Sequence, residues 1–158
     1  MTTPRRVTAG LVLGSMLVIF LACDHRTPTE PSGSEVAFQT VLKGSLAGQS
    51  PNLQGREAIR DQATWQAVWT ELHSLSPQPL PEVDFNREMV VVVLGPGCTG
   101  TVEVSSIVSQ RGELVVNAQA KACSNNLCFA ADFSAHVVRL PRSEAPVRLN
   151  VRSDVKLC

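Results

Sequence analysis

The sequence contains no tyrosine and few aromatic side chains of any kind, with five phenylalanines and two tryptophans among 158 residues. It also lacks a run of basic residues, and its 14 lysines and arginines are balanced by 14 aspartates and glutamates. A nucleic-acid-binding domain needs a cationic stripe on its surface, and this composition does not supply one. We therefore exclude nucleic acid as a partner.

Long apolar runs are rare, and the most extended one lies at the N-terminus. Arg5 and Arg6 precede an almost uninterrupted apolar stretch, residues 7–22, which ends at Cys23. This arrangement is typical of an export signal. The apolar stretch is short for a membrane span, which needs about 20 residues.

The four residues "FLAC", which end at Cys23, resemble a bacterial lipobox, although leucine is the usual residue where Phe20 stands. The resemblance implies transfer of a diacylglyceryl group to the Cys23 thiol and cleavage just before this residue. A plain secretory signal and an uncleaved anchor are the alternatives. We expect residues 1–22 to be a lipoprotein signal peptide. Cys23 would then anchor the protein to a membrane of the bacterial cell envelope, on the periplasmic side or at the cell surface.

The chain after the signal divides into a linker and one domain. The segment "DHRTPTEPSGSE" is rich in proline, serine, threonine and charge, and it cannot bury enough apolar surface to fold. We therefore assign residues 23–34 to a flexible tether. Residues 35–158 have the length of a single domain with one core.

Four further cysteines, Cys98, Cys123, Cys128 and Cys158, lie in this domain. An even number of cysteines in an exported chain predicts two disulfides. We prefer Cys123–Cys128, which would close a loop around the turn-forming Asn-Asn pair, and Cys98–Cys158, while the two other pairings remain open. A zinc site is the alternative, but the spacing suits metal ligands poorly. We expect neither a metal nor a cofactor.

One amphipathic helix is predicted from the segment "DQATWQAVWTELHSL". Trp65, Val68, Trp69 and Leu72 recur at helical spacing and share one face, and Asp61 precedes them as an N-cap. The prolines of "SPQPLPE" bar continuation of the helix. The two tryptophans anchor this helix on a sheet or, as the less favoured alternative, form an aromatic binding surface.

The rest of the domain has the patterns of β-strands. Residues 89–94 form a continuous apolar run, which predicts a central strand covered on both faces. Alternating or short β-rich segments predict further strands in "EVAFQTVLKGS", "REAIRD", "TVEVSSIVS", "ELVVNAQAKA", "FSAHVVRLP" and "VRLNVRSDVKL". We predict an α+β fold, mostly β, with antiparallel, sandwich-like sheets and one amphipathic helix packed against them.

Signatures of catalysis are scarce. No GxSxG, HExxH, P-loop or GxGxxG pattern occurs. Of the three histidines, His25 falls in the tether, His73 at the end of the predicted helix and His136 within a strand. We expect the protein not to be an enzyme. The alternative is an envelope hydrolase that uses Asp84, Glu88 or His136.

The order of motifs over residues 38–142 resembles the PrcB C-terminal domain family. The segments that carry the resemblance are "VLKGSLAG", "REAIRDQATWQAVWTEL", "LPEVDFNREMVVVVLG", "GTVEV", "GELVVNAQ" and "FSAHVVRLPR". The resemblance implies a non-catalytic domain that binds and stabilises a protease or another exported protein. The chain departs from the family after the apolar run, where Cys98–Val102 replaces a Gly-Gly-Tyr-like turn, so the identity of the partner does not carry over.

We therefore expect a lipid-anchored envelope domain that binds or stabilises an exported protein, with a protease as one possible partner. Loops on a rigid sheet commonly carry binding residues. The predicted binding residues are Gly97, Thr99 and Gly100 in one loop and Asn125 and Asn126 in the other.

Overall fold

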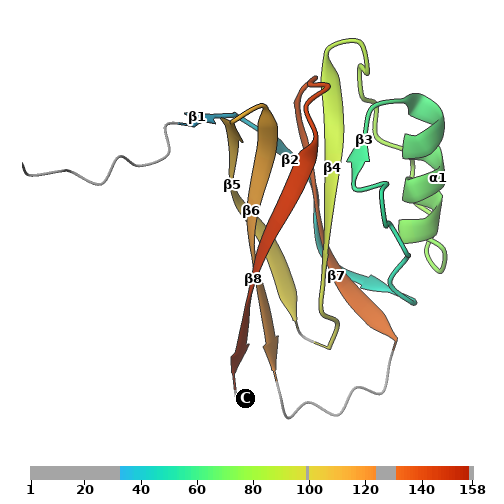
Figure 1. Cartoon of the computed structure of the whole chain (residues 1–158). Helices are drawn as coiled ribbons and strands as arrows, with labels where there is room; N and C mark the ends of the chain where they lie inside the picture. The colour runs from blue at the N-terminus through green and yellow to red at the C-terminus, as the bar shows by residue number, and fades with distance from the viewer. Residues whose placement is uncertain (1–32, 99, 124–130, 157–158) are drawn as a thin grey trace, which may run out of the picture. The chain divides into compact units, whose positions relative to one another are not determined.

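The computed structural model describes residues 33–98, 100–123 and 131–156 of the chain (Figure 1). In this part of the chain the elements are, in order, β1 (Ser34–Glu35), β2 (Gln39–Ala47), β3 (Ala58–Ile59), α1 (Gln62–Leu72), β4 (Glu88–Gly95), β5 (Thr101–Gln110), β6 (Glu113–Cys123), β7 (Asp132–Pro141) and β8 (Val147–Lys156). The predicted helix and the predicted strands are all found.

The strands form two four-stranded sheets, and the helix adds a third layer. The first sheet has the order β1-β5-β6-β8, and the second sheet has the order β2-β7-β4-β3. Figure 1 shows the two sheets face to face, with α1 on the outer side of the second sheet. The fold is α+β, mostly β and sandwich-like, which confirms the predicted fold class.

An inner core fills the space between the two sheets. Side chains alternate between the two faces of a strand, so every second residue of β4, β5, β6 and β7 points inward. The buried residues of this inner core are Met89, Val91, Val93, Val102, Val104, Ile107, Leu114, Val116, Ala118, Ala120, Val138 and Leu140. Burial of these side chains from both sheets holds the sandwich together.

An outer core lies between α1 and the second sheet. The helix contributes the predicted stripe of Trp65, Val68, Trp69 and Leu72, all of them buried. These four pack with Leu53, Ile59, Val90, Val92, Phe133, Ala135 and Val137. The two tryptophans therefore anchor the helix on the sheet, as the favoured interpretation predicts.

Polar contacts set the ends of α1. The Asp61 side chain accepts a hydrogen bond from the Thr64 amide at 2.8 Å, and the Thr64 hydroxyl donates to the same carboxylate at 2.8 Å. At the other end the His73 amide donates to the Trp69 carbonyl at 3.1 Å. The indole N–H of Trp65 donates to the Pro81 carbonyl at 3.0 Å, which fixes the proline-rich connector against the helix.

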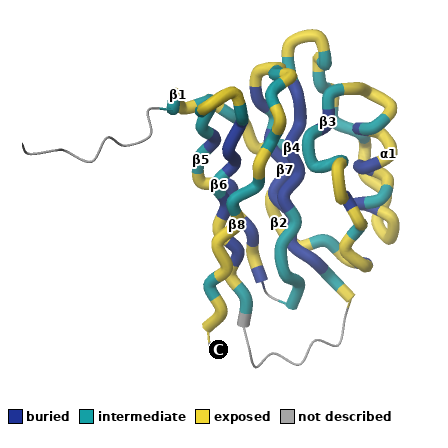
Figure 2. The backbone as a smooth tube through the Cα atoms, viewed as in Figure 1, coloured by how far each residue is buried: buried dark blue, intermediate teal, exposed yellow. Residues whose placement is uncertain are grey.

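Strand β4 is central to the second sheet, as its continuous apolar run predicts. It pairs with β7 along its whole length and with β3 on its other side. Its residues from Met89 to Val93 are all buried, with exposures of at most 1%. Figure 2 shows β4 and β7 as the most continuously buried strands of the molecule.

The pairing of β6 with β8 differs from the all-antiparallel expectation. These two neighbours run parallel, with Leu114 beside Val147 and Cys123 beside Lys156. The reason is topological: the chain leaves β6, returns through β7 in the second sheet, and re-enters the first sheet as β8. Because the chain reverses direction once into β7 and once more into β8, β8 runs parallel to β6.

The start of the described chain joins the first sheet. Ser34 and Glu35 pair with Ser109 and Val108, so the last residue of the predicted tether already belongs to β1. The predicted signal and the anchor residue Cys23 lie outside the described residues. Among the described residues, no helix has the length and apolar character needed to cross a bilayer.

Replacing the N-cap residue Asp61 tests how much its hydrogen bonds stabilise α1. We expect Asp61→Ala to lower the free energy of unfolding by about 1 kcal/mol, because the Thr64 amide and hydroxyl lose their acceptor. Urea denaturation followed by tryptophan fluorescence measures this change. The neighbouring exposed substitution Gln62→Ala is the control and should stay within about 0.5 kcal/mol of the parent chain. Equal effects of the two substitutions would contradict the cap assignment.

Candidate binding site

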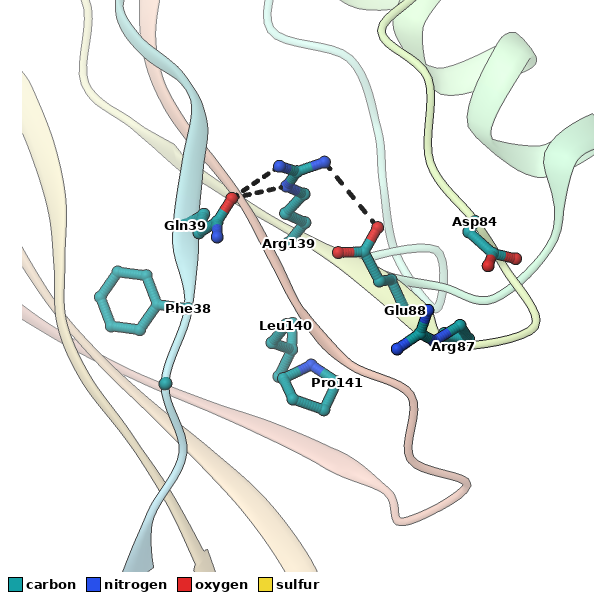
Figure 3. Close-up of a pocket in the computed structure, with 9 residues that line it drawn as sticks. Phe38, Gln39, Asp84, Arg87, Glu88, Arg139, Leu140 and Pro141 are labelled. Carbon is teal, nitrogen blue, oxygen red and sulfur yellow. Dashed lines mark hydrogen bonds and ion pairs between the residues drawn. The ribbon is translucent and has the colours of Figure 1, made fainter.

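A depression of about 660 Å³ lies where β2 and β4 begin and β7 ends. Its volume falls within the range of small-molecule sites. Figure 3 shows its lining, which comes from three strands and from the turn before β4. The lining residues are Ala37, Phe38, Gln39, Asp84, Arg87, Glu88, Arg139, Leu140 and Pro141.

A row of polar side chains crosses this depression. Arg139 of β7 donates to the Gln39 side-chain oxygen at 2.6 and 3.0 Å, and it lies 3.8 Å from the Glu88 carboxylate. The three residues stand on adjacent strands β2, β7 and β4, so the sheet itself sets their spacing (Figure 3). Because Glu88 faces a guanidinium, it is held as an ion-pair partner rather than left available as a base.

The turn before β4 places Asp84 and Arg87 on the same rim. The Asp84 side chain accepts from the Asn86 amide at 3.1 Å, and its carbonyl accepts from the amides of Arg87 and Glu88. Asp84 thus stabilises the turn before β4. The exposed Arg87 guanidinium has no hydrogen-bond or ion-pair partner among the described residues, so it is available to a ligand.

Apolar surface lies beside these charges. Phe38 is partly buried against the inner core, Leu140 is buried, and Pro141 is exposed at the end of β7. Figure 3 shows Leu140 and Pro141 on the same side of the polar row as Arg87, with Phe38 toward the Gln39 end of the row and Arg87 at the Glu88 end. The combination suits an apolar segment that carries a carboxylate, which a guanidinium binds with charge-assisted hydrogen bonds.

His136 does not belong to this depression. The strand register puts Pro141 beside Glu88, at the depression, and His136 beside Val93. His136 therefore lies about five residues, or roughly 16 Å, along β7 from the end of the strand that lines the depression. His136 is only 2% exposed and lies between the sheets. The three residues of the hydrolase alternative are therefore not brought together: Asp84 and Glu88 share the rim, and His136 is remote from both.

The hydrogen bonds of His136 define its protonation state. Its Nδ1 accepts from the Val104 amide at 2.7 Å, so Nδ1 carries no proton. Its Nε2 lies 2.9 Å from the Thr40 hydroxyl and carries the ring proton of the neutral form. Burial, together with the nearby ammonium group of Lys43, lowers the pKa of His136, while Glu103 partly opposes this shift.

The first predicted binding loop, between β4 and β5, lies at the opposite end of the sandwich. In the first loop, the Cys98 amide donates to the Asp132 carboxylate at 2.7 Å, and the Gly100 amide donates to the Gly97 carbonyl at 3.1 Å. A Cβ at Gly97 would collide with the Asp132 backbone, and one at Gly100 would lie 2.7 Å from the Pro96 carbonyl oxygen. Both glycines are thus required by a tight turn, and Gly100 is buried.

Several predicted site residues lie outside the described part of the chain. They are Thr99, Asn125, Asn126, Cys128, Cys158 and Cys23. Cys98 is disulfide-bonded, and its partner is a cysteine whose side chain is not described. The pairings Cys123–Cys128 and Cys98–Cys158 therefore stay predictions. Among the described residues, no three histidine, cysteine, aspartate or glutamate side chains form a group that could hold a metal.

Sequence reasoning had not singled out Phe38, Arg87 or Arg139. Phe38 stood in a predicted strand and Arg139 near the end of another, while Arg87 lay beside the two carboxylates considered for catalysis. No local pattern connects positions so far apart in the chain. The pairing of β7 with β2 and β4 creates this site.

Comparison with known proteins does not assign this chain to a family. No family model, no curated protein and no solved structure matches this chain. The resemblance to the PrcB C-terminal domain family therefore depends on the motif order alone.

Protonation of His136 should destabilise the fold at mildly acid pH. The folded state holds the neutral ring and has a pKa below the unfolded value of about 6.5, so the unfolded state binds more protons in this range. Stability should be full above pH 6.5 and should fall as the pH drops from there towards the lower pKa of the folded state. Urea midpoints measured between pH 7.5 and pH 5 test this expectation.

The matched variant is His136→Asn, whose side-chain oxygen can accept from the Val104 amide without titrating. Its overall stability will be lower, but the slope of its stability between pH 7.5 and pH 5 should be clearly smaller. An unchanged slope would show that other groups titrate in this range.

Proposed function

We propose that this protein is a non-catalytic, lipid-anchored domain of the bacterial cell envelope that binds or stabilises another exported protein. The depression at the β2, β4 and β7 end is its binding surface for a segment of that partner. Binding requires no cofactor and no metal.

The available guanidinium of Arg87 beside the apolar surface of Phe38 and Pro141 is the observation that carries this proposal. The Glu88 carboxylate is paired with Arg139 and the Asp84 carboxylate accepts from the Asn86 amide, which leaves the Arg87 guanidinium as the group that can bind an anion. A protein segment with an acidic side chain next to an apolar one matches this surface. Catalysis is less well supported, because the neutral His136 lies far along β7 from the carboxylates of Asp84 and Glu88.

The N-terminal sequence supports the location. A basic start, a short apolar stretch and Cys23 followed by a polar linker together favour export and lipid attachment. The tether would let the domain reach a partner while the lipid holds it at the membrane. The motif order that resembles the PrcB C-terminal domain family supports an exported protease, or a protein associated with one, as the partner.

Photo-crosslinking tests the binding surface in the cells that make the protein. We expect p-benzoylphenylalanine in place of Phe38 to give a discrete adduct with an envelope protein. Arg87→Glu in the same chain should reduce the adduct at least severalfold, because a charge-assisted hydrogen bond is replaced by repulsion. Quantitative immunoblotting of the adduct measures the change.

Two controls distinguish binding at this surface from non-specific crosslinking. The photo-reactive residue at Leu75, which is 69% exposed after the helix, should not give the same adduct. Lys121→Glu makes the same charge change at an exposed position at the other end of the sandwich and should leave the Phe38 adduct intact. If both charge reversals act equally, or if position 75 captures the same protein, the depression is not the binding surface.

Membrane attachment is tested separately at the predicted acylation site. Cys23→Ser should move the protein from the membrane pellet to the soluble envelope fraction, because the thiol that accepts the lipid is removed. Intact mass of the parent chain should correspond to an acylated Cys23 at the N-terminus. A Cys23→Ser protein that still sediments with membranes would contradict lipid anchoring.

A further inference from the structure

Strand β8 leaves one edge of the first sheet open. It is ten residues long, it pairs with β6 on one side, and no other strand among the described residues pairs with it. The opposite edge strand, β1, is two residues long. Long open edges expose main-chain donors and acceptors and are sites where another strand adds.

The direction of the β8 main chain follows from its contact with β6. The Leu114 amide donates to the Pro146 carbonyl at 2.9 Å, so Pro146 points its carbonyl toward β6. Successive residues of a strand point their main-chain groups to alternate sides. The even-numbered residues of β8 therefore bond to β6, and the odd-numbered residues, Val151 among them, point theirs to the open edge.

The inner face of β8 is covered only at its beginning. Val147 and Leu149 pack against the inner core. Val151 and Val155, which share their face, are 40% and 63% exposed, and they are two of the three large apolar side chains exposed in the described chain. Figure 2 shows the second half of β8 as largely exposed. This edge thus combines open main-chain groups with uncovered apolar side chains.

We propose that two copies of this chain pair through β8, antiparallel, about a two-fold axis at Val151. In this register Val151 faces Val151 of the second copy, and Val147 faces Val155. The odd-numbered residues then exchange their main-chain hydrogen bonds as paired neighbours, which is the bonding arrangement of an antiparallel ladder. The two first sheets become one continuous sheet, and both exposed valines gain apolar neighbours.

The charges on the outer face of β8 select this register. Arg148, Arg152, Asp154 and Lys156 share that face. Centring on Val151 puts Arg148 opposite Asp154 of the second copy, twice by symmetry, and Arg152 opposite Asn150. Centring one residue earlier or later opposes arginine to arginine, or arginine to lysine, which is unfavourable.

Two registers centred nearer the end of the strand also bring unlike charges together, and the one centred on Val155, with Asp154 opposite Lys156, pairs only the last residues of β8. Centring on Ser153 puts Arg152 opposite Asp154 and Val151 opposite Val155. It leaves the first part of β8, including Val147, without a paired strand in the second copy. The register centred on Val151 engages the whole strand, and it differs from the one centred on Ser153 in which arginine meets Asp154.

Native mass spectrometry of the full chain in mild detergent, over a series of protein concentrations, measures the association. We expect a dimer, and we expect Arg148→Asp to raise its dissociation constant at least about tenfold, because attraction becomes repulsion at two symmetric places. The double variant R148D/D154R restores unlike charges at both places and should restore the dimer. Arg152→Asp makes the same charge change on the same strand and should have less than about a threefold effect.

A second variant tests the main-chain pairing itself. Val151→Pro removes an amide that points to the open edge, a position where an edge strand tolerates proline, so the monomer should stay folded while the dimer is lost. Thermal unfolding of each variant confirms the fold. A monomer at every concentration, rescue by R152D/D154R instead of R148D/D154R, or a dimer insensitive to Val151→Pro would each overturn the proposal. The depression at the other sheet does not involve β8, so partner binding and dimer formation are tested independently.

Discussion

The pairing of β4 with β7 is the interaction on which the rest of the structure depends. Both strands are buried on their two faces, and they supply residues to the core between the sheets and to the core beneath the helix. The ladder carries alternate side chains into both cores, so its burial stabilises all three layers together. A change in the register of this pair by one residue would exchange the two cores and separate the layers.

The ends of this ladder explain where polar chemistry is found. Where the helix and the opposite sheet no longer cover β7, Arg139 and its neighbours Gln39 and Glu88 emerge and line the depression. Within the covered part, burial lowers the pKa of His136, and the neutral ring accepts from the Val104 amide and links the two sheets by hydrogen bonds. The same strand thus supplies a structural histidine and a surface arginine, because burial changes along its length.

The two sides of the sandwich are closed in different ways. On one side β2, an edge strand of the second sheet, is joined to β5 of the first sheet by the ion pair of Lys43 with Glu103 at 2.6 Å and by the contacts of His136. On the other side β3 is too short to cover β8, which keeps an open edge. One side is therefore completed within the chain, and the other is available to a second strand. The turn that holds Cys98, between β4 and β5, lies at one end of the sandwich, away from the depression.

Local patterns in the sequence determined the elements: the capped helix with its four buried residues, the fully covered strand β4, and the β-rich class. These features depend on the periodicity of apolar residues and on residues that are close together in the chain. The structure alone decided that β8 runs parallel to β6, that Phe38, Arg87 and Arg139 meet, and that His136 stands apart from Glu88. Those outcomes depend on which strands pair and in which register, and pairing joins residues that are as much as 100 positions apart, as Gln39 and Arg139 are. A single sequence contains no local signal for such contacts.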